Sequence, residues 1–156
     1  MTLHGDYEPS SFRQIRDQVA LYEATDGQEG GTLENRPVII LTHRGAKTGK
    51  LRKTPLMRIE HDDGYIVVAS YGGAPDHPVW YYNLLAHPLV EVHDCATTRV
   101  FRAREVSGSE KTELWKTADA AWPHFPEYRA STDRDLPVFV LSPAPDQEVS
   151  HARDQP

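Results

Sequence analysis

Cysteine and long apolar runs are what this chain of 156 residues most plainly lacks. Its single cysteine, Cys95, excludes an internal disulfide and a thiol cluster for structural zinc. No run of 18 apolar residues is present to form a transmembrane helix, and the N-terminal sequence has neither the basic nor the apolar region of an export signal. We therefore expect a soluble, cytoplasmic protein with no integral membrane segment.

Familiar signatures of catalysis are also missing. The sequence contains no G-x-G-x-x-G motif of a Rossmann fold, no G-x-S-x-G elbow of an esterase and no H-E-x-x-H motif. Residues 45–51 differ from a Walker phosphate loop, because three residues instead of four separate the glycines and Leu51 replaces the magnesium-binding Ser or Thr. The histidines are scattered over different segments, so we predict no metal site.

Basic residues are few and unevenly placed. The net charge of −6 argues against nucleic-acid binding. Six of the 17 basic residues nevertheless lie between positions 44 and 58, with no acidic residue among them: Arg44, Lys47, Lys50, Arg52, Lys53 and Arg58. This basic cluster indicates a site for a small anionic ligand, and the alternative is a solvated charged surface.

Hydrophobic periodicity and turn residues predict a single domain over residues 1–156, with flexible tails at 1–9 and 144–156. Apolar residues at 12, 15, 19 and 22 predict a helix that begins near position 10. A second helix, capped by Asp76, is predicted to end before Pro88. A capping box of Ser107 and Glu110 predicts a third helix to about residue 122, and 123–132 a short helix or turn.

Short strands fill most of the remaining sequence. They are predicted at residues 38–42, 56–60, 65–70, 89–93, 98–106 and 137–141. Because no βαβ rhythm is present, the pattern favours an α+β fold with an antiparallel barrel over a doubly wound sheet.

Two glycine-containing segments carry unusual local chemistry. Residues 45–56 (GAKTGKLRKTPL) join a glycine turn to alternating cations, which suits an anionic ligand. Residues 69–84 (ASYGGAPDHPVWYYNL) join a strand end and a glycine pair to the start of a helix, where a flat ligand could approach the backbone closely. Together they predict a site for a flat, anionic cofactor.

The sequence resembles the deazaflavin-dependent nitroreductase family, a group of actinobacterial enzymes that use coenzyme F-420. The resemblance covers about residues 30–143 and rests on G-x-K-[ST]-G-K-x-R-x-x-P-L at 45–56, A-S-x-G-G-A-x-x-x-P-x-W-Y-x-N-L at 69–84, the NLLAHP run at 83–88 and the YRASTDR run at 128–134. It implies an antiparallel split β-barrel with flanking helices, and an oxidoreductase that transfers hydride from the reduced coenzyme to an organic acceptor.

The resemblance also implies roles for individual residues. Lys47, Lys50 and Arg52 would bind the phosphate and the oligoglutamate tail of the coenzyme. The ring and the close backbone approach would involve Pro55, Leu56, Met57, Ala69, Ser70, Gly72, Gly73 and Ala74, with Trp80, Tyr81 and Asn83 closing the groove or holding the helix. The acceptor side would consist of Met57, Ser70, Trp122, Phe125 and Tyr128.

We expect Ser70 or Tyr128 to act catalytically, by donating a hydrogen bond to the acceptor oxygen that gains charge. Family members can show tyrosines at the positions of Trp122 and Phe125, so here only Tyr128 keeps a hydroxyl, and nitroimidazole reduction does not follow from the resemblance. The alternative for these three aromatic residues is an ordinary core. For Ser70 it is a hydrogen bond to the backbone.

Quinones, unsaturated carbonyls and nitroaromatics are the expected acceptors. Two further functions fit the same residues: an FMN-binding split-barrel oxidoreductase, and a coenzyme or lipid carrier without turnover. The expected partners are a small-molecule hydride acceptor and, at most, a second copy of the chain in a homodimer. A peripheral membrane location is a minor variant, because the first helix carries only Arg13 and Arg16 as cations.

Overall fold

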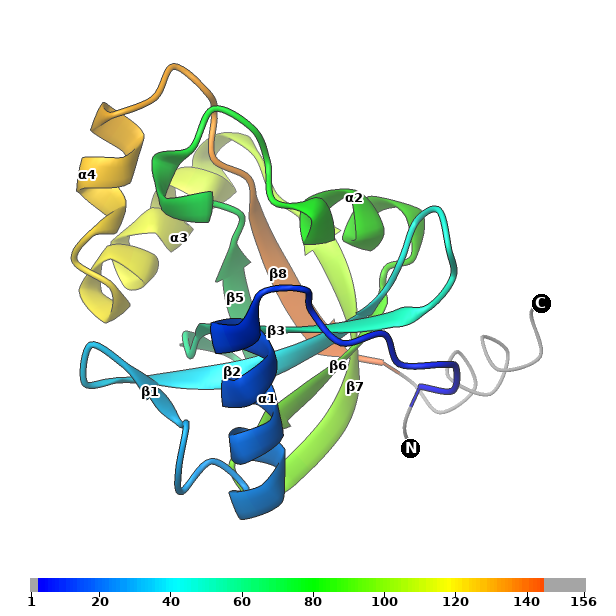
Figure 1. Cartoon of the computed structure of the whole chain (residues 1–156). Helices are drawn as coiled ribbons and strands as arrows, with labels where there is room; N and C mark the ends of the chain where they lie inside the picture. Colours follow the sequence, from blue (N-terminus) through cyan, green and yellow to red (C-terminus); the bar gives the residue numbers. More distant parts are fainter. Residues whose placement is uncertain (1–2, 145–156) are drawn as a thin grey trace.

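The computed structural model describes residues 3–144, and their core is one antiparallel sheet that curls into a half-barrel with helices around it (Figure 1). The strands are β1 (Thr32–Leu33), β2 (Arg36–Arg44), β3 (Leu51–Met57), β4 (Glu60–His61), β5 (Gly64–Val68), β6 (Leu89–Asp94), β7 (Thr97–Glu105) and β8 (Val138–Pro143). Their order is β1-β2-β6-β7-β8-β5-β4, and β3 pairs with β2 outside this path. The predicted antiparallel split barrel is confirmed.

Helices cover the sheet on several sides. They are α1 (Arg13–Thr25), α2 (Val79–Ala86), α3 (Gly108–Ala121) and α4 (Phe125–Ala130), with a short 3-10 turn, η1 (Tyr71–Gly73), after β5. Trp80 and Leu84 of α2 pack with Phe101 and Phe139 in the largest buried cluster, inside the curl of the sheet. A second cluster joins α3 and α4 to β5 and β8. No helix in residues 3–144 is long and apolar enough to cross a membrane.

The β6–β7 hairpin and the end of α2 follow the sequence prediction closely. Burial alternates strictly along β6, because one face of the strand packs inside the sheet and the other does not. Helix α2 ends at Ala86, one residue before the His87-Pro88 pair that was predicted to stop it.

The strand predicted over residues 56–60 is wrong, because this segment belongs to two strands. Strand β3 ends at Met57, and the chain then bends so that β4 pairs with β5 instead of β2. The bend is held by Arg58, whose backbone N–H donates to Pro37 and whose guanidinium pairs with Asp94 at 3.0 Å. A bend of this kind lets a strand change partners at a barrel corner.

Two predicted helix caps are also wrong. Helix α2 begins at Val79 after Pro78, so Asp76 lies too far ahead to cap it. Ser107 occupies the N-cap position of α3, but its side chain makes no capping hydrogen bond. Glu110 turns instead to Arg104, with which it forms two hydrogen bonds of 2.8 and 2.9 Å. A charge-assisted bidentate pair is stronger than a neutral cap bond.

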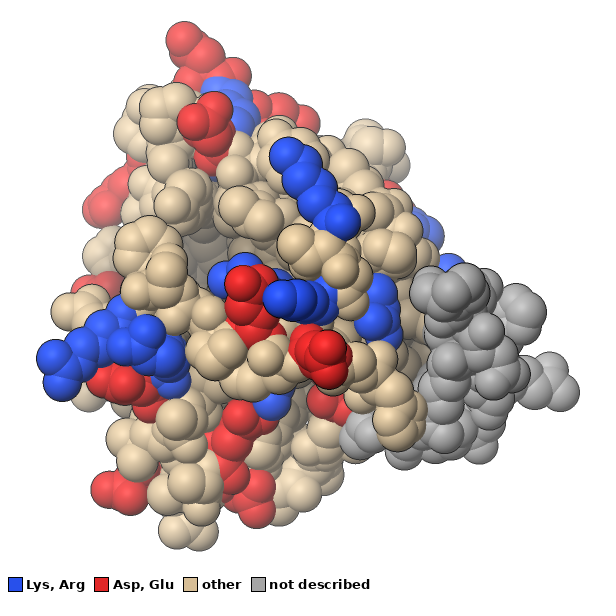
Figure 2. Space-filling view, turned by 45° about the vertical axis from the view of Figure 1, so that its right-hand side comes forward, with Lys and Arg blue, Asp and Glu red and all other residues tan. Residues whose placement is uncertain are grey.

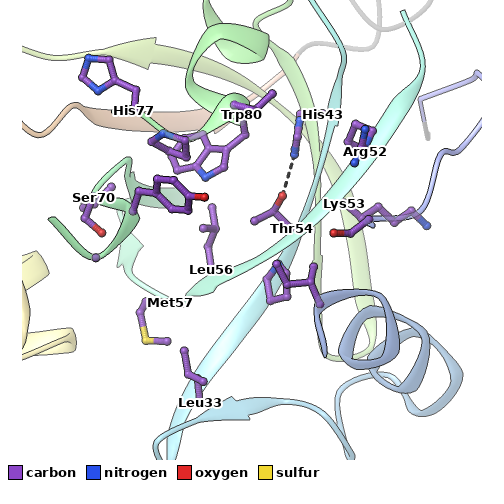
Figure 3. A pocket seen from close by; sticks show the side chains of 18 of the residues that line it. Leu33, His43, Arg52, Lys53, Thr54, Leu56, Met57, Ser70, His77 and Trp80 are labelled. Atoms are coloured by element: carbon purple, nitrogen blue, oxygen red, sulfur yellow. Dashed lines mark hydrogen bonds between the residues drawn. The ribbon is translucent and has the colours of Figure 1, made fainter. Parts of the chain in front are cut away.

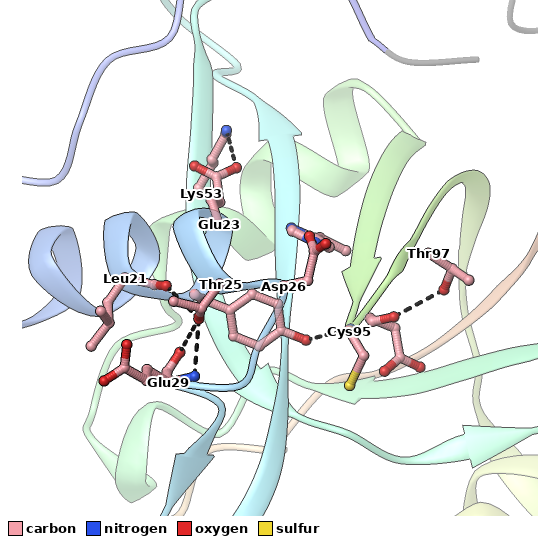
Figure 4. A network of polar contacts seen from close by, with 11 residues as sticks. Leu21, Glu23, Thr25, Asp26, Glu29, Lys53, Cys95 and Thr97 are labelled. Carbon is pink, nitrogen blue, oxygen red and sulfur yellow. Dashed lines mark hydrogen bonds and ion pairs between the residues drawn. The ribbon is translucent and has the colours of Figure 1, made fainter.

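The N-terminal segment and α1 are attached to the barrel near β3. Backbone hydrogen bonds join Asp6 and Glu8 to Leu51, although residues 1–9 were expected to be a flexible tail. At its other end α1 is held by a polar network in which the Tyr22 hydroxyl accepts the backbone N–H of Cys95, from the β6–β7 turn (Figure 4). The predicted tail at 144–156 lies, after residue 144, outside the described residues.

Candidate functional site

A cavity of about 620 Å³ opens beside β3, between α1, the η1 segment, α2 and α4. This volume is typical of a site for a cofactor or a drug-sized molecule. Every residue of β3 from Arg52 to Met57 lines it. Elements far apart in sequence supply the other walls: Phe12 and Ile15 near α1, Ser70 to Gly72 after β5, Trp80 and Asn83 of α2, and Trp122, Phe125 and Tyr128.

One end of the cavity is basic. Arg52 and Lys53 of β3 line it, and each is paired with a carboxylate from the N-terminal part of the chain. Arg52 contacts Glu8 at 3.1 Å, and Lys53 contacts Glu23. Basic and acidic side chains lie next to one another beside a hollow in the surface (Figure 2). No acidic residue belongs to the described lining itself.

The basic cluster of the sequence is divided among different tasks in the structure. Lys47 and Lys50 lie exposed on the turn between β2 and β3, outside the cavity lining, and form no ion pair with the described residues. The Arg44 guanidinium donates to the Gly49 and His4 carbonyls, and Arg58 holds the bend after β3. Only Arg52 and Lys53 therefore bring their charge to the cavity.

The other part of the cavity is apolar. Leu56, Met57 and Trp80 line it together with Trp122 and Phe125, which are also buried against the cluster of α3 and α4. Trp122 and Phe125 therefore belong to the hydrophobic core and to the cavity wall at the same time. At the opening, the exposed apolar side chains of Phe12, Leu33, Tyr71 and Val79 form a rim.

Two hydroxyl groups face this apolar part. The Tyr128 oxygen accepts the indole N–H of Trp122 at 3.3 Å, which leaves the phenolic proton free to be donated elsewhere. Ser70 is buried between β5 and η1, and its hydroxyl makes no hydrogen bond with the described residues. Its backbone carbonyl, by contrast, accepts the Gly73 N–H and the Arg134 guanidinium.

Arg134 holds the whole segment between β5 and α2. Its guanidinium donates to the carbonyl oxygens of Ala69, Ser70 and Ala74 at 2.6–3.1 Å and to Nδ1 of His77 at 2.6 Å. Burial, and then the Arg134 charge, lower the pKa of His77 below its ordinary value. The planar fork of one arginine therefore fixes three carbonyls that a flexible glycine segment would otherwise leave mobile.

A buried polar group that the sequence analysis missed lies behind β3 (Figure 3). His43 of β2 contacts the Thr54 hydroxyl through Nε2 at 3.0 Å and the Asn83 side-chain amide through Nδ1 at 3.0 Å. Burial, and then the charge of Arg52, lower the pKa of His43 to about 3, so the ring is neutral at physiological pH. A histidine at the end of the apolar run VIILT was the only sequence signal for it.

The structure brings most of the predicted site residues together. Those that line the cavity are Arg52, Pro55, Leu56, Met57, Ser70, Gly72, Trp80, Asn83, Trp122, Phe125 and Tyr128. Lys47, Lys50, Ala69, Gly73, Ala74 and Tyr81 lie outside the lining. Tyr81, for example, packs on Phe139 and donates its hydroxyl to Glu105 at 3.1 Å. Lys53 also lines the cavity, as a member of the predicted basic cluster, whereas Thr54, His77 and the apolar rim are lining residues that were not predicted individually.

Known proteins share both the sequence and the fold. An F420H(2)-dependent quinone reductase of Mycobacterium tuberculosis strain H37Rv is 34% identical over 132 residues, which are 82% of this chain and 89% of that protein. The solved structure of an F420-H2 dependent reductase, FDR-A, has 45% identity and a TM-score of 0.65, over 69% of this chain and 95% of that one. A structure described as a domain-swapped dimer has 41% identity and a TM-score of 0.67, over 81% and 96%.

A more distant structure shares the fold alone. The heme storage protein HutZ from Vibrio cholerae has a TM-score of 0.54 at 14% identity, over 72% of this chain and 84% of that one. The decisive match is to a family model, that of the F420H(2)-dependent quinone reductases, which extends over residues 14–143. The chain therefore belongs to the F420H(2)-dependent quinone reductase family of deazaflavin-dependent oxidoreductases, whose coenzyme is F-420.

Proposed function

We propose that the cavity beside β3 binds reduced coenzyme F-420 and that the protein uses it to reduce a quinone. The observation that carries this proposal is the polarity of the cavity: cations at one end, an apolar slot at the other, and no carboxylate in the described lining. A flat ring with a polyanionic tail requires this arrangement. Family membership already decides against the alternatives of FMN and of a carrier without turnover.

The residues fit the coenzyme part by part. Arg52 and Lys53 would bind its anionic portion, and Lys47 and Lys50 on the adjoining turn would hold the outer part of the tail. Leu56, Met57 and Trp80 would enclose the ring. When bound, the reduced coenzyme supplies a hydride donor, and the protein contributes orientation and the exclusion of water.

The acceptor would lie against Trp122, Phe125 and Tyr128. Its oxygen gains negative charge during reduction, and a hydrogen bond directed at that charge lowers the barrier. Ser70 and Tyr128 can both supply one, since the Ser70 hydroxyl has no partner among the described residues and the Tyr128 proton is not used by Trp122. The apolar slot and rim favour a quinone over a charged acceptor, with unsaturated carbonyls and nitroaromatics as further substrates.

The test has a binding arm and a turnover arm. Intrinsic tryptophan fluorescence is followed while coenzyme F-420, FMN or NADPH is added, and only the deazaflavin is expected to bind at micromolar concentration or below. Oxidation of the reduced coenzyme by a soluble quinone is then measured for Ser70→Ala and Tyr128→Phe. At least one should lower turnover tenfold, which is about 1.4 kcal/mol.

Tyr82→Phe is the matched control, because Tyr82 is exposed and lies outside the cavity lining. Preference for FMN in the binding arm would contradict the assignment of the cavity. Unchanged turnover in both variants would show that neither hydroxyl stabilises the developing charge.

The cellular setting belongs to the same proposal. The cytoplasmic location expected from the sequence stays a proposal, and no helix of residues 3–144 could span a membrane. The apolar rim leaves a peripheral contact with the membrane as a variant. The homodimer is supported by the related structure described as a domain-swapped dimer.

A further inference from the structure

The backbone N–H of Ala46, which can only donate a hydrogen bond, fixes the orientation of the Asn83 side-chain amide. The backbone N–H of Ala46, on the turn after β2, meets the Asn83 side chain at 2.9 Å. A backbone N–H only donates, so the atom it meets is the amide oxygen. The NH₂ group of Asn83 therefore points to the other neighbour, Nδ1 of His43.

This orientation determines which nitrogen of His43 carries the proton. The Asn83 NH₂ group donates to Nδ1 at 3.0 Å, so Nδ1 is the bare, accepting nitrogen. A neutral imidazole has one N–H, which must then be on Nε2. The burial that lowers the His43 pKa to about 3 agrees with this neutral form.

The hydrogen bond from His43 to Thr54 has the same direction as the one from Asn83 to His43. The His43 Nε2–H donates to the Thr54 oxygen at 3.0 Å, so this hydroxyl is an acceptor toward the protein. Its own proton has no partner among the described residues, and Thr54 lines the cavity between Arg52 and Leu56. The hydroxyl proton is therefore available to a molecule in the cavity.

We propose that Asn83 and His43 are positioning residues that leave the Thr54 hydroxyl proton free, so that this hydroxyl donates a hydrogen bond to the bound coenzyme. The proposal rests on the proposed function, because it requires the coenzyme to bind in this cavity. The coenzyme must then present an oxygen or nitrogen acceptor at Thr54, where the basic end of the cavity meets the apolar slot. An acceptor is favoured over a donor at this position, because a donor would reach only the second lone pair of the Thr54 oxygen and would leave the hydroxyl proton without a partner.

The first test needs no ligand. A long-range proton–nitrogen correlation spectrum of the imidazole rings at neutral pH shows which nitrogen of His43 is protonated, with the signals assigned by their loss in His43→Gln. We expect the proton on Nε2. A proton on Nδ1 would overturn the proposal, because Thr54 would then donate to His43 instead of to the cavity.

The second test measures the affinity for coenzyme F-420 by tryptophan fluorescence. Thr54→Val keeps the shape and removes the donor, and should weaken binding about tenfold, or about 1.4 kcal/mol. Thr54→Ser keeps the hydroxyl and should bind within about twofold of the unmodified protein. Thr98→Val, an exposed threonine of β7 outside the cavity lining, is the matched control.

The outcomes separate the two proposals. Equal affinity of Thr54→Val and the unmodified protein would overturn the role of Thr54 while leaving the cavity as the coenzyme site. A protein that binds no coenzyme F-420 would overturn both, although the spectrum of His43 would still show whether the series of donors exists. Weak binding by Thr54→Val and by Thr54→Ser alike would also count against the proposal, because it would assign the loss to packing.

Discussion

Gly73 offers a sharp test of how the site is assembled, because it touches the helix that carries Tyr128. Its φ is +80°, and a Cβ built on it would lie 3.0 Å from the Tyr128 carbonyl oxygen, 3.2 Å from the Tyr128 Cα and 2.6 Å from the Ser131 hydroxyl. The Ser131 hydroxyl can rotate aside by itself, whereas the backbone at Tyr128 can give way only if α4 shifts as a whole. Gly73→Ala should therefore push α4 away from η1.

Gly72 is the matched control. It also has a positive φ, +63°, but a Cβ on it would meet nothing within 4 Å. The left-handed conformation costs a non-glycine residue about 1–2 kcal/mol, which is the whole expected loss of unfolding free energy for Gly72→Ala. Forcing an extra methyl into a packed contact adds about 1–3 kcal/mol. We therefore expect Gly73→Ala to lose about 2–5 kcal/mol in total.

Urea denaturation followed by tryptophan fluorescence and by circular dichroism gives both free energies, and coincident transitions check two-state behaviour. Adding Ser131→Ala to Gly73→Ala removes the hydroxyl contact and should recover only a minor part of the loss. If Gly73→Ala costs no more than Gly72→Ala, the contact between η1 and α4 is not rigid and does not place Tyr128 at the cavity.

Three further perturbations address the charges around the cavity. Glu8→Gln should tighten the binding of coenzyme F-420 by up to about fivefold in low salt. The substitution breaks the half-exposed ion pair with Arg52, at a cost of only about 0.2–1 kcal/mol, and frees Arg52 for the coenzyme. Unchanged or weaker affinity in a titration would contradict this. His43 binds its proton only near pH 3 when folded but near 6.5 when unfolded, so the unfolded state takes up more protons between these values and stability falls as the pH falls through that window. The slope from this group approaches about 1.4 kcal/mol per pH unit and should be missing in His43→Gln, measured by denaturation across the pH range. Arg134→Lys keeps the charge but not the fork, and should lose about 2–3 kcal/mol of unfolding free energy and speed amide hydrogen exchange over residues 69–74; protected amides there would show that the carbonyl contacts are dispensable.

Elements set by local signals were predictable from the sequence. The β6–β7 hairpin follows from alternating apolar residues, and the end of α2 follows from a residue placed before proline. Strand β3 was only partly predicted from the sequence. Its residues from Arg52 to Met57 all line the cavity, so the strand shows neither an alternating nor a uniformly apolar pattern. The bend after Met57 depends on Asp94, which is 36 residues away from Arg58 and gives no local sign.

The site was predictable where motifs place residues and unpredictable where partners are distant. The basic cluster reads as one feature in sequence, yet Glu8 and Glu23, which pair with Arg52 and Lys53, lie 44 and 30 residues from them. His43 ends an apolar run that predicts an ordinary buried strand. Only the fold shows that Thr54 and Asn83 stand on either side of it.

Several polar groups of the cavity share one property that no single motif expresses: each has a free hydrogen-bond donor to offer a ligand. Arg52 and Lys53 carry only N–H groups, and the hydroxyls of Thr54 and Tyr128 each accept one hydrogen bond, from His43 and Trp122, and keep their own proton free. Such a lining favours a polyanionic coenzyme at one end and an oxygen that gains charge at the other. It supplies no carboxylate base among its described residues. Coenzyme recognition and transition-state stabilisation thus both depend on hydrogen-bond donors that point into the cavity. The fold sets the direction of these donors, although the site, within residues 3–144, contains no catalytic dyad.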